Sequence, residues 1–456
     1  MGVDIIAFLM NPFVLMFAVV VSGALFGSIR FGRFSFGVSG TLFTGLLAGW
    51  LVYSQGGGAP SYETVGKAAD GGLVPNDFFE LFLIIFMASV GLLASKDVPA
   101  VMKRYGFRFI VMGMATTFVG FLMTYGLTLA LASNLENVSP YEVSGVYTGA
   151  LTSSPGLAAA LETAKKESAK VYDEYIEAGY LQKQKILETI SPGGGLNPVD
   201  FPRLSQEQVD AYSERAEAEV GIGHAVAYPF GVLIVILSMN FFPKIFRIDI
   251  EEEWVRYERE IGSERGSPET RRAQDGDFDP AAFFLVCILG FFVGSVSFPI
   301  GSPGNFALGT TGGVLTVSLI LGCIAKIGPL SFCMNEHILV TLRLISISFF
   351  LGIVGLRYGG EVVASISRSG AVLVATAVII CIVAATFSFV LGRYVFGMNW
   401  IILSGAVCGG MTSTPGLGAA VDTLGSDKPA GGYGAAYPFA LLTKVVLVII
   451  LHKLPM

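Results

Sequence analysis

The sequence predicts an all-α polytopic membrane protein made of two homologous, inverted repeats, each with five transmembrane helices and one broken segment. Three observations support this prediction. The 456 residues are 53% hydrophobic and only 14% charged, and the apolar residues gather in stretches long enough to cross a bilayer. A proline-glycine break also occurs twice inside such stretches, in nearly the same local sequence. Two copies of one unusual motif are typical of an internal duplication.

Ten apolar stretches approach the roughly 20 residues that a spanning helix needs. The N-terminal stretch has no basic residue before its apolar run, so we expect it to remain as a membrane helix rather than a cleaved signal peptide. The stretches are 5–28, 36–53, 78–95, 107–132 and 223–242 in the first half, and 281–298, 306–325, 338–356, 371–391 and 435–451 in the second.

Two polar stretches interrupt this series and divide the chain. Residues 165–222 hold two charged helical runs around the loop-like SPGGGLNPVDFPRL, which predicts a small extramembrane insertion within the first repeat, residues 1–242. Residues 243–280 are rich in charge and separate that repeat from the second, residues 281–456. We expect this linker to be cytoplasmic and to behave as a solvated hinge.

The break reads TSSPGLAAALET from Thr152 and TSTPGLGAAVDT from Thr412. Between residues 148–163 and 408–423, 9 of 16 positions are identical, which chance explains poorly. The match continues in the same order along both halves: AYPF at 227–230 recurs at 436–439, and VGL at 90–92 recurs at 354–356. The two halves are therefore collinear copies of one membrane unit.

Broken helices at matching positions of two repeats are the best sequence indication of a transporter's binding site. Proline removes an amide donor, and the freed backbone groups need protein, water or a ligand as partners because lipid offers none. The half-helix after each break begins with a partial positive charge that suits a carboxylate. A plain kink that packs against a neighbour is the alternative. The predicted substrate-binding residues at the breaks are Thr152, Ser153, Ser154, Pro155, Gly156, Thr412, Ser413, Thr414, Pro415 and Gly416.

Charged residues inside apolar stretches are costly and are therefore candidates for function. Arg343 aligns with Phe79 of the first repeat, and we add it to the predicted substrate site because a guanidinium can hold a carboxylate at two points. Its alternatives are an ion pair with a protein acid or snorkelling to the interface. Lys444 is a candidate for coupling or gating, unless it simply approaches the membrane interface.

Two further pairs recur at equivalent positions of the repeats. Glu162 and Asp422 lie two turns beyond each proline and are either proton or cation sites or solvated acids. Tyr228 and Tyr437 precede prolines and serve either as gates or as packing at a helix kink. His224 is expected to be a satisfied polar residue rather than a proton relay.

The paired T-S-[ST]-P-G-L segments, each followed by an AYPF helix, resemble the aspartate:alanine exchanger family of bacterial secondary transporters. The resemblance covers nearly the whole chain. It implies exchange or export of small amino acids and dicarboxylates such as aspartate, alanine and succinate. It also implies a homodimer with a fixed scaffold and an elevator-type transport part. Typical relatives carry two potassium-transport-regulator-like (TrkA-C) domains between the halves, where this chain has only the 243–280 linker.

Loop charges predict the orientation in the membrane. The first four loops carry 2, 1, 4 and 0 Lys or Arg, an alternation that places the first and third loops in the cytoplasm. The N-terminus is then extracytoplasmic. If the break dips in and returns, each half has five crossings, the second half is inverted and the C-terminus is extracytoplasmic too. If both breaks cross fully, the repeats are parallel. We expect a multi-pass protein of the bacterial inner membrane.

The predicted function is antiport of a small carboxylate or amino acid held between the two broken segments. A Na⁺- or H⁺-coupled symporter or exporter is the alternative, and an ion channel is a remoter one. An enzyme is not expected, because H-E-x-x-H and G-x-S-x-G motifs are missing from the sequence. Five cysteines and three histidines without paired spacing predict no disulfide, metal site or cofactor. The net charge of −6 gives no nucleic-acid footprint, so the expected partners are substrate, membrane lipid and a second copy of the chain.

Overall fold

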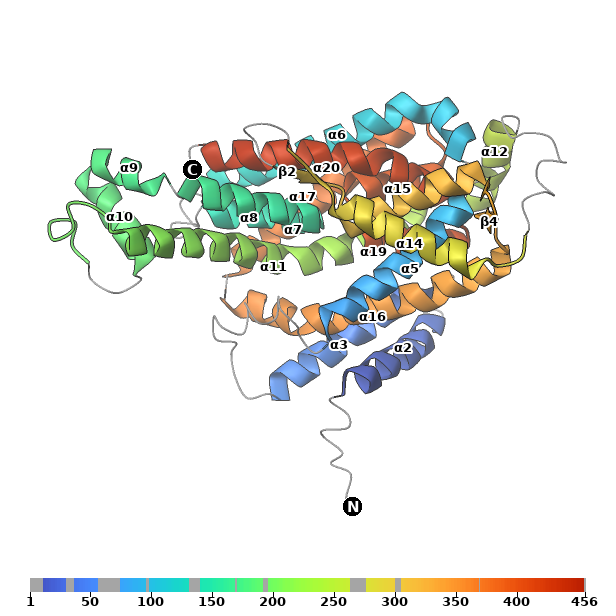
Figure 1. Cartoon of the computed structure of the whole chain (residues 1–456), viewed down its shortest axis with the longest axis horizontal. Coiled ribbons are helices and arrows are strands. Elements are labelled where there is room, and N and C mark those ends of the chain that lie inside the picture. Colours follow the sequence, from blue (N-terminus) through green and yellow to red (C-terminus); the bar gives the residue numbers. More distant parts are fainter. Residues whose placement is uncertain are drawn as a thin grey trace, which may run out of the picture.

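In the computed structural model, most of the long helices run along one common axis (Figure 1). The structure describes residues 11–29, 37–55, 74–95, 98–130, 140–168, 170–191, 196–262, 276–299, 305–368 and 370–454. The side chains of three predicted site residues, Ser154, Pro155 and Glu162, lie outside this description, although their backbone lies within it. These three residues are therefore placed only by the helix that contains them.

The described part of the chain is almost entirely helical, and its order repeats. The first half contains α2 (Pro12–Ser28), α3 (Gly40–Gln55), α5 (Asn76–Ala94), α6 (Val98–Ala130), α7 (Pro140–Ala150), α8 (Ser154–Ser168), α9 (Val171–Glu177), α10 (Tyr180–Ile190) and α11 (Gln206–Ile245). The second half contains α14 (Pro280–Ser295), α15 (Gly309–Ile324), α16 (Glu336–Arg368), α17 (Gly370–Val390), α18 (Trp400–Gly410), α19 (Thr414–Leu424) and α20 (Pro429–Lys453), with α12 (Ile250–Gly262) between the halves. Short turns complete the set: the 3₁₀ turn η1 (Gly37–Ser39), the π-helical turn η3 (Leu391–Val395), and two hairpins, β1 (Ser297–Pro299) with β2 (Asn305–Ala307) and β3 (Lys326–Ile327) with β4 (Leu330–Ser331).

Within the described residues, each of the ten predicted spans overlaps a helix. Residues 5–10, 36, 131 and 132 of these spans lie outside the described ranges. Six of the described helices, α5, α6, α11, α16, α17 and α20, are long and apolar enough to cross a membrane. Four shorter apolar helices, α2, α3, α14 and α15, occupy the remaining predicted spans. The predicted all-α polytopic membrane protein is confirmed.

Equivalent helices begin with equivalent caps, which is a local reason why each half starts where it does. Asn11 accepts a hydrogen bond from the Phe13 amide at 3.0 Å and is followed by a proline at the first helical position of α2. Asp279 accepts from the Ala282 amide at 3.0 Å and is likewise followed by a proline in α14. Such a cap pairs a backbone amide of the first turn that has no partner within the helix. Proline suits the first helical position because it has no amide hydrogen that would need a partner.

The two halves contact each other reciprocally. Helix α3 of the first half packs on α16 of the second, and α5 packs on α15 in the equivalent way. Helix α6 packs on α20 just as α17 packs on α11. Here α3 and α15 are equivalent helices, and so are α5 and α16. Exchanging the two halves therefore turns each of these contacts into the other, as a two-fold relation between the repeats requires. The predicted duplication is therefore also a duplication in space.

The first broken segment is a hairpin that lies along α11. Helix α7 runs in the same direction as α11, reaches its tip at Thr152, and α8 then returns towards the start of α11. The contacts that fix this course are Gly145 with Val220, Thr152 with Gly231, and Lys165 with Glu217 at 3.9 Å. Both ends of the broken segment therefore lie at the same end of α11, as expected of a re-entrant segment rather than a crossing one.

The second broken segment follows the same course along α20. Helices α18 and α19 have 11 residues each, which corresponds to about 16 Å. Gly405 of α18 packs against the backbone of Pro429, the first residue of α20. Helix α19 ends at Leu424, only five residues before that proline. The chain therefore rises through α18, descends through α19 and rises again through α20.

The insertion and the linker lie at opposite ends of the bundle (Figure 1). The insertion consists of α9, α10 and the start of α11, and it has a small core of its own that includes Tyr175, Leu187 and Leu204. This arrangement matches the predicted pattern of two helical runs around a loop.

The linker helix α12 is packed against the bundle, so the expectation of a solvated hinge is wrong for residues 250–262. Tyr257 and Ile261 are fully buried, and Glu253 is nearly so. Glu253 accepts a hydrogen bond from the Trp400 amide at 2.6 Å and lies 2.8 Å from Arg393. A carboxylate at the N-terminus of α18 is favoured by the partial positive charge there. The charged sequence of the linker predicted a solvent-exposed segment, because a sequence does not show which distant residues will pair with its charges.

Candidate functional site

Each break has the same unusual backbone conformation. Thr152 and Thr412 both have positive φ angles, 51° and 54°, which are uncommon for a residue with a branched side chain. In both, the threonine amide donates to the carbonyl three residues back, at 2.8 Å to Gly149 and 3.0 Å to Gly409. A strained conformation kept at both tips indicates that the surroundings stabilise it and that it is a feature of the site.

The half-helices that follow the breaks are capped by serine. Ser153 Oγ accepts from the Gly156 amide at 3.1 Å, and Ser413 Oγ accepts from the Gly416 amide at 3.2 Å. Pro155 and Pro415, which directly precede these glycines, have no amide hydrogen to offer. The protein itself therefore satisfies backbone donors that were expected to meet the substrate, and Ser153 and Ser413 act as caps in this conformation.

The two tips bond directly to each other. Thr152 Oγ1 donates to the Met411 carbonyl at 3.1 Å, and Thr412 Oγ1 donates to the Leu151 carbonyl at 2.8 Å. These reciprocal bonds join residues about 260 positions apart in the chain. The structure thus brings the two predicted breaks together, and their tips are in direct contact.

Lys444 of α20 lies at this junction. Its side chain is 0% exposed, and its Nζ donates to Thr412 Oγ1 at 2.8 Å and to the Leu151 carbonyl at 3.2 Å. The stem of Lys444 passes over the start of α8, since a Cβ added at Gly156 would meet Lys444 Cδ at 3.0 Å. The possibility that Lys444 approaches the membrane interface does not hold, because the ammonium is enclosed between the two tips.

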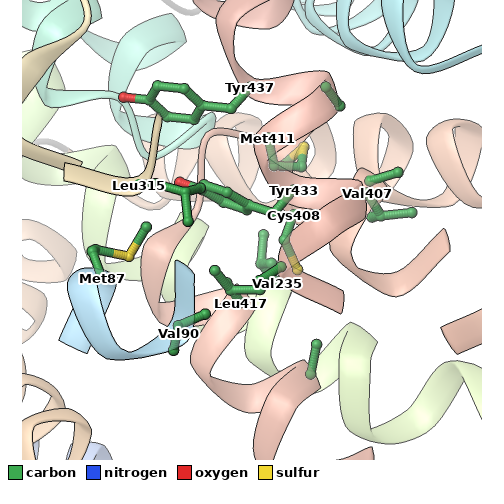
Figure 2. Packing of buried hydrophobic residues seen from close by; sticks show 14 of the residues in the cluster. Met87, Val90, Val235, Leu315, Val407, Cys408, Met411, Leu417, Tyr433 and Tyr437 are labelled. Carbon is green, nitrogen blue, oxygen red and sulfur yellow. The ribbon is translucent and has the colours of Figure 1, made fainter. Parts of the chain in front are cut away.

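The equivalent position in the first half is apolar. The AYPF match aligns Lys444 with Val235, and Val235 packs over Gly416 of the second hairpin just as Lys444 packs over Gly156 of the first. Figure 2 shows Val235 beside Cys408 and Leu417 in a cluster of buried hydrophobic residues. Two geometrically equivalent positions therefore differ in that one holds a buried lysine and the other a valine.

Aromatic rings line both hairpins in equivalent pairs. Tyr433 and Tyr437 stack with centroids 5.3 Å apart, and both lie in the view of Figure 2. Their counterparts His224 and Tyr228 lie 5.2 Å apart. Tyr437 donates to the Leu308 carbonyl at 3.1 Å. The predicted pair Tyr228 and Tyr437 therefore packs beside the tips in helices that each contain a proline at the next position. Either predicted role, packing or gating, is compatible with this placement.

His224 is a satisfied buried residue, as its sequence context predicted. Its Nδ1 lies 2.9 Å from Thr148 Oγ1. Thr148 aligns with Cys408, and His224 aligns with Tyr433. The hydroxyl and imidazole beside the first hairpin therefore correspond to a thiol and a phenol beside the second. Thr148 and Tyr433 carry no motif of their own in the sequence. The AYPF segments at 227–230 and 436–439 are 209 positions apart. The same spacing, continued along the last helix of each half, pairs His224 with Tyr433.

Arg343 lies away from the tips and pairs with a protein acid. Its Nη1 is 2.7 Å from the carboxylate of Asp427, in the connection between α19 and α20, and both side chains are largely buried. The alternative left open by the sequence, an ion pair with a protein carboxylate, is the one that the structure contains. The pair ties α16 to the end of the second hairpin.

The acid Asp422 is also placed by a specific contact. Its carboxylate accepts a hydrogen bond from the Val38 amide at 3.0 Å, beside Gly37, whose φ is 52°. Asp422 is therefore a partner of the chain turn before α3 rather than a freely solvated acid. The side chain of its counterpart Glu162 lies outside the described residues.

The described residues contain no group of three or more His, Cys, Asp or Glu that could hold a metal ion. No disulfide joins the five cysteines, all of which lie within the described residues.

A bundle of membrane-spanning helices with a re-entrant hairpin in each of two repeats is the architecture of a multi-pass membrane protein, and such paired broken segments are typical of transporters. A family described as a predicted permease membrane region matches residues 15–244 and 282–453, and the chain belongs to this family. The aspartate:alanine exchanger family predicted from the repeated motif is thereby confirmed. The unmatched residues 245–281 coincide with the linker.

Known relatives are described as uncharacterized transporters. One from Bacteroides thetaiotaomicron is 31% identical over 212 residues, which cover 46% of this chain and 38% of the relative. One from Rhodopirellula baltica is 38% identical over 155 residues, covering 34% of this chain and 29% of the relative. A third, from Geobacter sulfurreducens, is 24% identical over 559 residues, covering 97% of this chain and 98% of the relative. The chain thus matches less than half the length of the first two and nearly all of the third.

Proposed function

We propose that this transporter exchanges small carboxylates or amino acids, such as aspartate, alanine or succinate, across the bacterial inner membrane. The observation that carries the proposal is the meeting of two hairpin tips around the buried ammonium of Lys444. A buried positive charge favours an anionic ligand, and tips held by only a few hydrogen bonds can separate to admit one.

The course of the chain supports alternating access by inverted repeats. Each broken segment returns along the helix that follows it, so it does not change the side of the membrane. The other five helices of each half are counted as crossings, which gives an odd number and inverts the second half relative to the first. The site between the tips then faces each side in turn as one group of helices moves against another.

The packing suggests which helices move together. Each hairpin contacts the last helix of its own half, α7 with α11 and α18 with α20, and also the last helix of the other half, α8 with α20 and α19 with α11. In the proposal these helices form the moving part of an elevator. The homodimer and the extracytoplasmic termini are proposed from the family resemblance and the loop charges.

Counterflow in proteoliposomes tests the proposed function. Vesicles loaded with unlabelled aspartate, alanine or succinate are expected to accumulate the labelled external substrate, and empty vesicles are expected to accumulate much less. No movement of any of these compounds under any gradient would contradict a carboxylate transporter. Uptake that needs Na⁺ or a proton gradient and ignores the internal substrate would favour the symport alternative. Single-channel currents would favour a channel.

A further inference from the structure

Lys444 has no counter-charge in the part of the chain that the structure describes. Its ammonium contacts a backbone carbonyl and a hydroxyl, both neutral, and no carboxylate of a described side chain forms an ion pair with it. Two of its three N–H groups are used, which leaves one donor. Arg343 provides the contrast, because this other buried cation lies 2.7 Å from the Asp427 carboxylate.

The fold does not require a charge at this position. Val235 occupies the equivalent place in the first repeat, covers the equivalent glycine, and lies among hydrophobic neighbours. Both tip threonines, Thr152 and Thr412, donate to a carbonyl of the opposite tip. Only one of the two tips is covered by a lysine. The charge of Lys444 is therefore an addition to a framework that is otherwise nearly symmetric.

An uncompensated ammonium is costly to move through a membrane. Charged groups inside a bilayer are stabilised by pairing or by water, and hydrogen bonds to two neutral oxygens offset only part of the loss of hydration. Lys444 is bound to the tips of both hairpins, so a movement of the hairpins carries the ammonium with them. The cost of that movement is lower when an anion accompanies the ammonium.

We infer that Lys444 is the coupling residue that restricts this transporter to exchange. The carboxylate of the substrate compensates the ammonium during translocation, so the loaded carrier crosses readily and the empty carrier does not. Net transport in one direction requires the empty carrier to return and is therefore slow. This inference rests on the proposed function, and it names the residue that enforces exchange and the carboxylate as the group that the residue recognises.

The experiment compares two fluxes of one labelled carboxylate in proteoliposomes, namely exchange against internal substrate and net efflux into substrate-free buffer. The variants are Lys444→Gln, which is neutral but can still donate hydrogen bonds, and Lys444→Arg, which keeps the charge. Lys444→Met is the second neutral variant if the glutamine protein fails to fold. Val235→Met is the matched control, because it changes the equivalent position of the other repeat without changing charge.

The wild type, Lys444→Arg and Val235→Met proteins are expected to exchange much faster than they release substrate. In the neutral variants the ratio of net efflux to exchange is expected to rise by about tenfold or more, since the empty carrier no longer moves a buried charge. An unchanged ratio in a folded neutral variant would overturn the inference. A folded neutral variant that catalyses neither flux would also overturn it, because the charge would then be needed for carriage itself. Absence of exchange in the wild type would instead refute the proposed function.

Discussion

The two hairpin tips share a backbone and differ in chemistry. Both have a threonine at positive φ, a serine cap, a proline and a glycine covered by a side chain of the other repeat's last helix. Over the first tip that side chain is Lys444, and over the second it is Val235. Both hairpins have the same backbone course and the same shared features, so these features account for the common geometry. The unshared lysine is not needed for the hairpin geometry and is therefore the better candidate for transport chemistry.

The largest expected effect concerns the Arg343–Asp427 ion pair, which holds the end of the second hairpin against α16. Arg343→Ala leaves the Asp427 carboxylate buried without its partner, which is expected to lower stability by about 3–5 kcal/mol. Thermal denaturation in detergent and the yield of folded protein measure this loss. Arg343→Lys is expected to keep the preference between dicarboxylates and monocarboxylates. A selective loss of dicarboxylate binding in that variant would restore Arg343 to the substrate site.

A second prediction separates stability from transport at the junction. Lys444→Met removes a buried amine that has no described counter-charge, so we expect the free energy of unfolding to rise by about 1–4 kcal/mol, the range seen when buried ion pairs are replaced by apolar residues. The melting temperature measures this gain. Val235→Lys, the reverse change at the equivalent position, is expected to lower it. If Lys444→Met is strongly destabilising, the ammonium is a structural part of the tips.

A third prediction tests whether the two hairpins are equally packed. A Cβ at Gly145 or Gly405 would overlap a backbone carbonyl of the neighbouring helix, that of Val220 or Pro429. Either substitution by Ala is expected to cost about 1–3 kcal/mol, since the helices have to separate. Gly126→Ala is the control, because that position has nothing within 4 Å. Clearly unequal losses at the two glycines would argue against equivalent packing.

The smallest effect distinguishes the two tip threonines. Thr412→Val removes one acceptor from Lys444 and the donor to Leu151, with an expected loss of about 1.5–3 kcal/mol because one partner is charged. Thr152→Val removes a bond between neutral groups only, with an expected loss of about 0.5–1.5 kcal/mol. Valine has the same branched shape, so the backbone strain is equal in the two variants. Equal losses in thermal denaturation would mean that the ammonium adds little to the Thr412 contact.

The sequence by itself determined the class, the duplication and the location of the breaks. Hydrophobic length identified the spanning helices, because lipid leaves a chain no other way to satisfy its backbone. The repeated TSSPGL and TSTPGL segments identified both hairpins, because proline and glycine interrupt a helix locally. Both signals, hydrophobic length and helix interruption, depend on residues that are close together in the sequence. They can therefore be recognised without knowledge of the fold.

Only the tertiary structure decided which polar residues meet. The same kind of signal, a charge within an apolar stretch, marked both Arg343 and Lys444, but one has the carboxylate of Asp427 as a partner and the other lies between two hairpin tips. The charged linker sequence predicted a solvated segment, but in the fold the Glu253 carboxylate contacts the Trp400 amide and the Arg393 guanidinium. The physical reason is that the state and role of a buried charge depend on partners within a few ångströms, and chain folding brings those partners from distant positions.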